Sequence, residues 1–501
     1  MRKSLKIELG TGMDTNKKTN KNAIYNTIKS VSSIIYPLIT FPYISRILLE
    51  ENVGKINFGN SIISYFSLIA SLGVTTYAIR ECSKVKDNKE QLEKTASEIY
   101  SLNIVSTLIS YFVLSVLLIV ARPLANYRAL ICVQSTVILF ATLGADWINT
   151  TMEDFRYITL RTISMQVISL VLMFAFVRKP EDYIIYAVIS VLATSGANLV
   201  NIFYRRRYFD LHFVTSMNVG KHLKPIMVLF SISISQIIYT NSDKTILGLI
   251  KGDAEVGLYS TSVSIYNIVN SMVASIAWVV IPQLSDAFAK KDYDKINNKV
   301  KYALNFIVVL GLPCFCGLEV IARELIIAIS GESFAAAAMS LRILGYALLC
   351  SFIGGWLGNI TMIPAGKEKI CLISSTIGAS VNIVLNLFLI PIWGLNAAAA
   401  TTVISELMSV LILAPNFDKN IHIDDKLKIL GSPILGSAGI VAIGMVVRNI
   451  MVIPWMVTVV TIVVSVIWYV AVLIILKNEF FMSIIQPLFN RFRRMLSNGI
   501  E

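Results

Sequence analysis

Ionisable side chains inside otherwise apolar stretches are the residues of this chain most able to do chemistry. Charged groups are costly in hydrocarbon, so those that occur there usually line a cavity or meet an opposite charge. The cations within predicted helices are Lys29, Arg46, Arg161, Lys244 and Arg342, and Arg80 ends the second helix. The anions are Asp146, Asp243, Glu319 and Glu406. Together they predict a site that handles charge within a membrane.

Lys244 is the cation hardest to explain as a structural anchor. It lies some 19 residues into the predicted helix 225–250. The adjacent Asp243 points about 100° away around the helix, so the two side chains cannot pair neatly. Tyr239, Thr240, Asn241 and Ser242 make the same stretch polar. The pattern favours a cavity-facing role for Asp243 and Lys244.

The other charged residues each have a structural alternative. Lys29 and Arg46 lie near enough to helix ends for their side chains to reach the headgroups. Arg80 could be an ordinary anchor at the membrane surface. Arg161 lies one turn inside its helix and could likewise be either an anchor or a functional residue. Glu319 could pair with Arg323 one turn later.

Asparagines at helical spacing form a second set of candidates. They are the pairs Asn198 and Asn201, Asn267 and Asn270, and Asn382 and Asn386, with Asn241 in addition. An amide on one helix face can bind carbohydrate hydroxyls, or it can join two helices, and the sequence leaves both interpretations open. Pro37 and Pro42 predict a bend in the first helix, which would suit a moving gate.

Motifs for enzymatic chemistry are absent from the sequence. There is no GxxxxGK[ST], HExxH or GxSxG, so we expect neither an ATP motor nor an enzyme. The six cysteines lie mostly in apolar runs without a CxxC pair, and the three histidines lack ligand spacing. We therefore predict no metal or cofactor. Energy for transport would come from a proton or sodium gradient, or from later steps that consume the product.

The composition predicts an integral membrane protein. Hydrophobic residues make up 55% of the 501 residues and charged residues 15%, with a mean hydropathy of +0.69. A soluble domain is about one quarter charged. The net charge of +13 could indicate nucleic acid binding in a soluble protein. In a membrane protein, cationic cytoplasmic loops account for it, and no nucleic acid partner is expected.

Apolar stretches of roughly 20 residues, enough to cross about 30 Å of hydrocarbon, recur along the chain. They predict an all-α polytopic fold of about 14 transmembrane helices. The predicted helices are 23–49, 56–79, 96–121, 129–148, 157–177, 183–204, 225–250, 256–282, 302–322, 334–364, 370–390, 394–415, 427–447 and 450–476.

The polar segments predict how these helices are grouped. The division is a cytoplasmic tail 1–22, a six-helix lobe 23–204, a cytoplasmic loop 205–224, a second six-helix lobe 225–415, helices 13 and 14 in 427–476, and a cytoplasmic tail 477–501. The first tail lacks an apolar core and a cleavage site, so we expect a flexible segment rather than a signal peptide.

The distribution of Lys and Arg supports fourteen crossings. Of the 44 Lys and Arg, 31 fall on the side of both termini, 8 on the opposite side and 5 within helices. Cationic loops stay in the cytoplasm, so both termini are predicted to be cytoplasmic.

This topology makes a testable prediction. Cysteine labelling should place Lys55, Lys179, Lys251 and Arg323 outside, and Lys84, Arg206, Lys291 and Lys426 inside. A wrong helix count would invert the charge alternation downstream of the error. Labelling of Arg206 and Lys291 from opposite sides of the membrane would therefore contradict the fourteen-helix topology.

Several motifs resemble those of one membrane family. Helix 1 carries Asn26 and PLITFPYISR (37–46), helix 2 carries Gly54, Asn57, Phe58 and GVTTYAIRE (73–81), and helices 7 and 8 carry NSDKTILG (241–248), VGLYS (256–260) and IPQLS (281–285). These resemble the O-antigen and capsule repeat-unit flippases of the multidrug/oligosaccharidyl-lipid/polysaccharide exporter superfamily. Helices 1–2 and 7–8 also share a weak internal repeat, seen at Val53-Gly54 and Val256-Gly257.

The resemblance implies two six-helix lobes in a V, with two further helices. It implies a bacterial cytoplasmic (inner) membrane protein that carries undecaprenyl-diphosphate-linked oligosaccharide to the outer leaflet by alternating access. Polysaccharide polymerase and chain-length proteins would be its partners. A diphosphate needs cations, which Lys29, Arg46, Arg80, Arg161, Lys244 and Arg342 could supply. The candidates for sugar binding or coupling are Asn241, Asp243, Asn267, Asn386 and Glu406.

The sequence leaves three alternative functions to be considered. A cation-coupled multidrug exporter on the same fold should place acids in its cavity, whereas helix 1 carries two cations within its apolar stretch and no acid there. A flippase for the peptidoglycan precursor would use the same carrier lipid. A membrane-bound polymerase or ligase would more often have a large outer loop, and the longest predicted one has only about a dozen residues.

Overall fold

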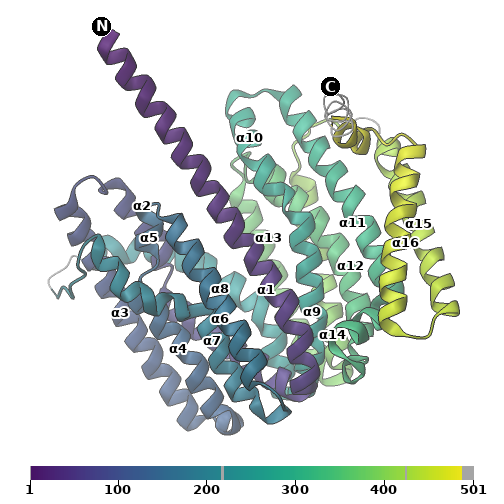
Figure 1. Ribbon diagram of the computed structural model, residues 1–501, viewed down its shortest axis with the longest axis horizontal. Coiled ribbons are helices and arrows are strands. Elements are labelled where there is room, and N and C mark those ends of the chain that lie inside the picture. Colours follow the sequence, from purple (N-terminus) through teal and green to yellow (C-terminus); the bar gives the residue numbers. More distant parts are fainter. Residues whose placement is uncertain (1, 216–218, 424–425, 488–501) are drawn as a thin grey trace, which may run out of the picture. The chain divides into compact units, whose positions relative to one another are not determined.

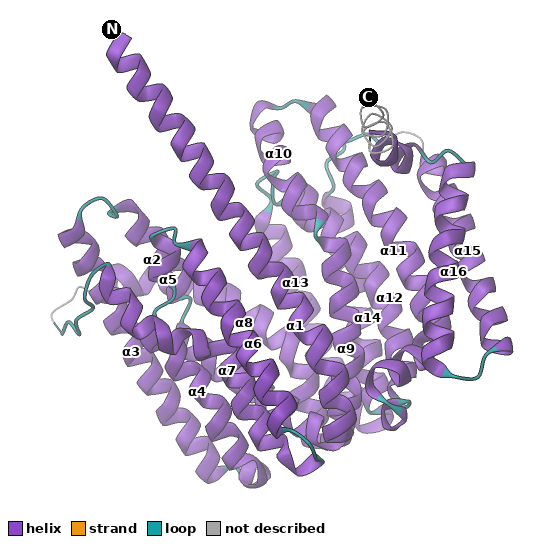
Figure 2. Cartoon of the chain, viewed as in Figure 1, coloured by secondary structure: helices purple, strands orange, loops and turns teal. Residues whose placement is uncertain are grey.

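The computed structural model describes residues 2–215, 219–423 and 426–487, and over these residues the chain forms helices and no strands (Figures 1 and 2). The first eight helices are α1 Arg2–Ser71, α2 Val74–Lys84, α3 Lys89–Val120, α4 Arg128–Gly144, α5 Trp147–Thr151, α6 Phe155–Phe176, α7 Tyr183–Tyr204 and α8 Val219–Ile250. The next eight are α9 Asp253–Ala274, α10 Ile276–Lys290, α11 Tyr293–Ser330, α12 Ala337–Gly355, α13 Glu368–Trp393, α14 Leu395–Leu413, α15 Lys426–Ile450 and α16 Pro454–Ile475.

The helices confirm a polytopic membrane fold. Thirteen stretches of the described residues are long and apolar enough to span a bilayer, and the first, Lys21–Lys84, is 64 residues long. At about 1.5 Å per residue that stretch is far longer than one crossing requires. It contains both of the first two predicted helices, which join at Leu49, where φ 60° and ψ 175° interrupt α1. This agrees with about fourteen crossings.

Some boundaries differ from the prediction. The polar segment 2–22 is helical and continuous with α1, because it contains no proline to stop the helix. The loop expected at 50–55 is reduced to the kink at Leu49. The predicted helix 256–282 is interrupted between α9 and α10, and the predicted helix 334–364 ends in a π-helix, Trp356–Met362.

The chain forms two compact units, which divide after Gly257. The sequence placed this division in the loop 205–224, so α8 groups with the first unit rather than the second. The reason is its contact with α1: the Thr245 hydroxyl lies 3.0 Å from that of Ser61 and 3.1 Å from that of Tyr65. Gly248 of α8 also lies directly against the Phe58 ring of α1.

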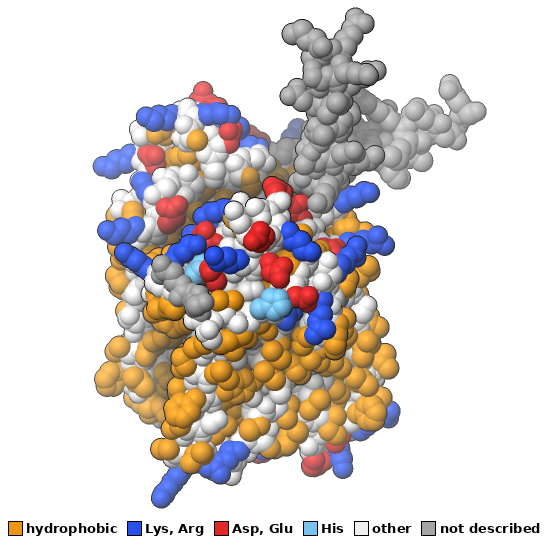
Figure 3. All heavy atoms as spheres, turned by 90° about the vertical axis from the view of Figure 1, so that its left-hand side faces the viewer, with side chains coloured by type: hydrophobic (Ala, Val, Ile, Leu, Met, Phe, Trp, Pro, Cys, Tyr) orange, Lys and Arg blue, Asp and Glu red, His pale blue; other side chains and the backbone are white. Residues whose placement is uncertain are grey.

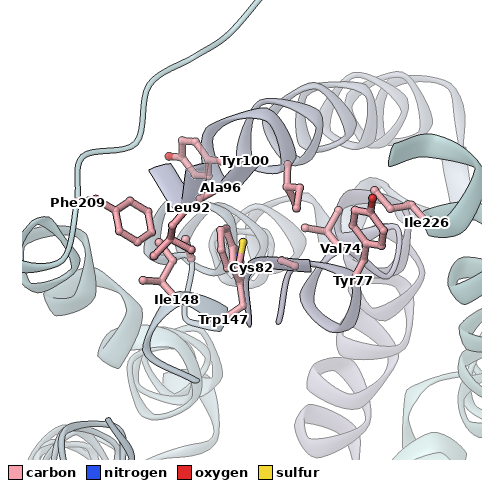
Figure 4. Packing of buried hydrophobic residues seen from close by; sticks show 13 residues of the cluster. Val74, Tyr77, Cys82, Leu92, Ala96, Tyr100, Trp147, Ile148, Phe209 and Ile226 are labelled. Atoms are coloured by element: carbon pink, nitrogen blue, oxygen red, sulfur yellow. The ribbon is translucent and has the colours of Figure 1, made fainter. Parts of the chain in front are cut away.

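A buried cluster joins one end of α2, α3, α5 and α8 within the first unit (Figure 4). Tyr77 and Cys82 of α2 pack with Trp147 of α5, Tyr100 of α3 and Ile226 of α8. Trp147 is only 4% exposed. Burial of so large a ring fixes α5 and therefore the position of Asp146, the residue before it.

The outer surface of the first unit suits contact with lipid. Along α3, large apolar side chains repeat at helical spacing and are mostly exposed, among them Leu108, Phe112 and Ile119. Figure 3 shows hydrophobic side chains forming a broad band on this face, with Lys, Arg, Asp and Glu gathered above and below it. This face therefore presents an apolar belt between two polar rims, as a bilayer requires.

In the second unit, the last two membrane helices pack on α11. Val309 of α11 forms a buried cluster with Ile440 of α15 and with Tyr469 and Leu473 of α16. The Tyr469 hydroxyl donates to the Val309 carbonyl oxygen at 2.8 Å. A buried phenol must find an acceptor, and this bond sets the register of α16 against α11.

Candidate functional site: a polar cavity in the first unit

A cavity of about 760 Å³ lies among the membrane-spanning helices of the first unit. Its walls come from α1, α2, α3, α4, α5, α7 and α8, with Asp146 in the turn between α4 and α5. Its size falls within the range of roughly 300–1,000 Å³ that small-molecule sites occupy. A cavity of this size inside apolar helices gives a polar solute room within the membrane.

Two stripes of small polar residues line the cavity. The α1 stripe is Asn60, Ser64, Ser67 and Ser71, and the α7 stripe is Ser190, Thr194 and Asn198. Spacings of three and four residues put each stripe on one helix face. Asn103 of α3 and Gln134 of α4 add amides, and these amides donate to carbonyl oxygens of α1 (Ala70 at 2.8 Å and Ile56 at 3.0 Å).

Asp146 is the one acidic residue among the described residues that line the cavity, and it is paired with Arg161 of α6. The Arg161 side chain is 3% exposed, whereas that of Asp146 is 37% exposed. The carboxylate therefore faces the cavity and the guanidinium lies behind it. Arg161 Nε and Nη1 are buried and have no hydrogen-bond partner among the described residues.

A chain of amides holds Asp146 in place. Asn149 donates to Asp146 Oδ1 at 3.2 Å and to Asn201 Oδ1 at 2.6 Å, and Asn201 donates to the Gly144 carbonyl oxygen at 2.7 Å. Asn149 and Asn201 are fully buried. The network joins α5 to α7 and α4, so the position of the carboxylate depends on three helices rather than on one flexible loop.

Asp154 sets the start of α6, the helix that carries Arg161. It caps this helix by accepting from the Tyr157 N–H at 3.2 Å, and it accepts from the hydroxyls of Tyr204 at 2.8 Å and Tyr208 at 2.7 Å. Burial raises the pKa of Asp154, but these hydrogen bonds outweigh burial and hold the pKa below its ordinary value. Asp154 thus stays ionised and ties α6 to the end of α7.

The predicted Asp243–Lys244 pair lies on α8 in the same unit. Asp243 is 7% exposed and Lys244 is partly exposed. Asn241 donates to the Ile237 carbonyl oxygen and to the Thr240 hydroxyl, both at 3.0 Å, so its amide bonds within its own helix. Neither Asp243 nor Lys244 is among the described residues that line the cavity, so their cavity-facing role stays a prediction.

A second buried amide group lies in the second unit. Asn386 of α13 donates to Asn382 Oδ1 at 3.0 Å and accepts from the Thr401 hydroxyl of α14 at 2.6 Å. Both asparagines are fully buried. In this structure the pair joins two helices, which is the structural alternative that the sequence left open.

The ion pairs of the second unit differ from the expected ones. Arg323 binds Glu332 at 2.8 Å, so it is not the partner of Glu319. Glu319 instead faces α12, where it lies within electrostatic range of Arg342. The spacing of one helical turn would permit a contact between Glu319 and Arg323. However, Glu319 lies on the side of α11 that packs against α12, where Arg342 is the nearer cation.

The remaining candidates do not gather at one point. Lys29 is partly buried on α1, while Arg46 on the same helix is exposed. Arg80 lies within α2, which continues to Lys84, and it pairs with Glu81 at 3.0 Å and lies over the Tyr77 ring. Asn267 is exposed on α9, and Glu406 is partly buried on α14. Lys29 and Arg46 are about 25 Å apart along a helix axis, which separates them into different regions of the first unit.

Most residues of the cavity wall were not predicted from the sequence. The α1 stripe and all of the α7 stripe except Asn198 consist of Ser, Thr and Asn, which carry no charge. Their signal was periodicity, because each stripe is a row of small polar residues on one face of an otherwise apolar helix. Such a row on a membrane helix indicates a wet cavity or a helix contact.

The fold and the cavity define a class of protein: a polytopic membrane protein of two helical units with a polar cavity among spanning helices. Two solved structures share this fold. A lipid II flippase MurJ in an inward closed conformation matches with a TM-score of 0.73 at 16% identity, covering 92% of this chain and all of that one. An inward-facing multidrug resistance MATE transporter matches with a TM-score of 0.58 at 14% identity, covering 78% of this chain and 96% of that one.

The sequence also identifies the family. A model of the polysaccharide biosynthesis protein family matches residues 19–288, and this chain belongs to that family. A protein of Escherichia coli K12 named as an O-antigen transporter is 25% identical over 54% of this chain and 66% of its own length. A protein of the same name from Shigella dysenteriae is 20% identical over 78% of this chain and 98% of its own length. The family membership that the motifs of helices 1, 2, 7 and 8 predicted is confirmed.

Proposed function

We propose that this protein is a flippase for lipid-linked oligosaccharides used in polysaccharide biosynthesis. The observation that carries the proposal is a polar cavity among membrane-spanning helices in a chain of the polysaccharide biosynthesis family. Two relatives named as O-antigen transporters support polysaccharide repeat units as the cargo. That the carrier lipid is undecaprenyl diphosphate is part of the proposal, and it comes from the resemblance of the sequence motifs. The same fold occurs in a lipid II flippase, so the fold is compatible with movement of a lipid.

The proposed mechanism is alternating access with the lipid tail left in the bilayer. The glycan and the diphosphate would cross among the helices, and cations on the path would bind the diphosphate. Lys29, Arg46 and Lys244 are the first candidates for that role, since they lie on the membrane-spanning stretches of α1 and α8. The direction would be from the cytoplasmic to the outer leaflet of a bacterial inner membrane, powered by an ion gradient or by downstream consumption.

Charge reversal tests this proposal. Lys29→Glu together with Arg46→Glu should cut surface glycan at least about tenfold, because two attracting cations are lost and two carboxylates that repel a diphosphate take their place. Cells lacking the chain should accumulate the lipid-linked intermediate. Binding of that lipid to the purified protein should weaken with added salt, since a water-open site is screened by ions.

The control carries the same charge change elsewhere. Lys89→Glu with Lys94→Glu alters two exposed residues at the start of α3, and it should leave surface glycan near normal. Overexpression should confer no resistance to cationic dyes. Dye efflux together with unchanged glycan export in the Lys29/Arg46 variant would favour the multidrug transporter and refute the flippase.

A further inference from the structure

We propose that the cavity of the first unit binds the glycan of the substrate, with Asp146 as the acceptor for sugar hydroxyls, and that the diphosphate binds elsewhere. This inference rests on the proposed function and assigns one part of the substrate to one cavity. Arg161 is then a positioning residue that holds Asp146, rather than a ligand of the diphosphate as the sequence suggested.

The charge of the cavity selects a neutral ligand. Asp146 and Arg161 pair, so the two charges largely cancel for any group further away. A diphosphate entering the cavity would meet the exposed carboxylate first, because the guanidinium lies behind it. A cation would be attracted to the exposed carboxylate, but only weakly, because Arg161 already neutralises most of that charge. A neutral polyol meets no repulsion, and it can donate hydroxyl hydrogen bonds to an ionised acceptor.

Asp146 has one oxygen available for a ligand. Its hydrogen bonds from Arg161 and Asn149 both go to Oδ1. Among the described residues no side chain donates to Oδ2, and the carboxylate is 37% exposed toward the cavity. The amide network behind Asp146 keeps that oxygen in one place. Binding a sugar would therefore cost little free energy for ordering the Asp146 side chain.

A buried donor beside Asp146 also lacks a partner. Trp147 lines the cavity, and its indole Nε1–H is buried without a hydrogen bond among the described residues. A buried donor left unpaired is unfavourable, so such a group points to a ligand that supplies an acceptor. A hydroxyl or acetamido oxygen of a sugar at this wall could accept from that N–H, while the indole ring itself is packed in the buried cluster of α2, α3 and α8.

The polar stripes complement hydroxyl-rich ligands. Ser64 donates its hydroxyl proton to the Asn60 carbonyl oxygen at 2.8 Å, and Thr194 donates to that of Ser190 at 2.9 Å. With their protons used within the helix, these oxygens present lone pairs to the cavity. The wall is therefore rich in acceptors, and a sugar is a ligand rich in O–H donors.

The test compares two lipids on the full-length protein in nanodiscs. One is the lipid-linked oligosaccharide that accumulates in host cells lacking this chain, and the other is undecaprenyl diphosphate without sugar. Ser190→Phe fills the cavity from α7, and Val188→Phe adds the same ring to the lipid-facing side of that helix, where Val188 is 51% exposed. Ser190→Phe should weaken binding of the glycan lipid about tenfold or more and leave binding of the bare lipid within twofold.

A second variant guards against misfolding by bulk. Asp146→Asn keeps the size of the side chain and removes the ionised acceptor. It should weaken binding of the glycan lipid and leave binding of the bare lipid unchanged. Val188→Phe should bind both lipids normally. Equal losses for both lipids, or unchanged glycan-lipid binding in folded Ser190→Phe and Asp146→Asn proteins, would overturn the glycan site. Failure of the wild-type protein to bind either lipid would instead refute the proposed function.

Discussion

Gly54→Ala should nearly abolish export and destabilise the first unit by at least about 3 kcal/mol, the upper end of the usual cost of overpacking. Gly54 of α1 and Gly257 of α9 pack backbone against backbone. A Cβ at Gly54 would fall on the Asp253 carbonyl oxygen, and a Cβ at Gly257 would fall on that of Glu50. Backbone atoms cannot rotate away as a side chain can, so the two helices would have to separate.

Because the two glycines contact each other's helix, the double variant is a control for the single variants. Once one alanine has separated the helices, the second should add little, so Gly54→Ala and Gly257→Ala should be far from additive in thermal melts of the purified protein. Gly317→Ala places a methyl group on α11 where nothing lies within 4 Å, and it should be neutral or slightly stabilising. Additive effects, or a normal melting temperature for Gly54→Ala, would contradict close packing at this point.

Lys244→Ala should abolish glycan export while protein abundance stays near normal. Lys244 lies within the apolar part of α8, where an ammonium group is retained only at a cost and therefore usually for a function. Lys244→Arg keeps the charge but changes its shape, and it should retain part of the export. Surface glycan and membrane abundance, measured in the same cells, separate loss of function from loss of protein.

Lys251→Ala is the matched control for this prediction. Lys251 follows the last residue of α8 and is exposed, so it can reach the membrane surface without lining any path. It should export normally. Normal export by Lys244→Ala as well would mean that Lys244 is solvated or structural, and the diphosphate would then need other cations.

The sequence by itself determined the helices and the family. Runs of about 20 apolar residues separated by charged loops are a local signal, and a bilayer leaves no other way to satisfy their backbone than a helix. The spans, the alternation of charge and the motifs of helices 1, 2, 7 and 8 therefore follow from the order of residues alone. The repeat of Val53-Gly54 and Val256-Gly257 is also visible in the sequence, whereas the contact between its two glycines is not.

Only the tertiary structure decided which of these residues meet. Asp146 and Arg161 both appeared as isolated charges, and their pairing depends on how α6 rotates and packs beside the turn between α4 and α5. Glu319 faces Arg342 rather than Arg323 for the same reason, because helix packing determines which face of α11 is buried. The cavity required two stripes on α1 and α7, over a hundred residues apart, to converge. Periodicity shows that a helix has a polar face, whereas only packing shows what that face meets.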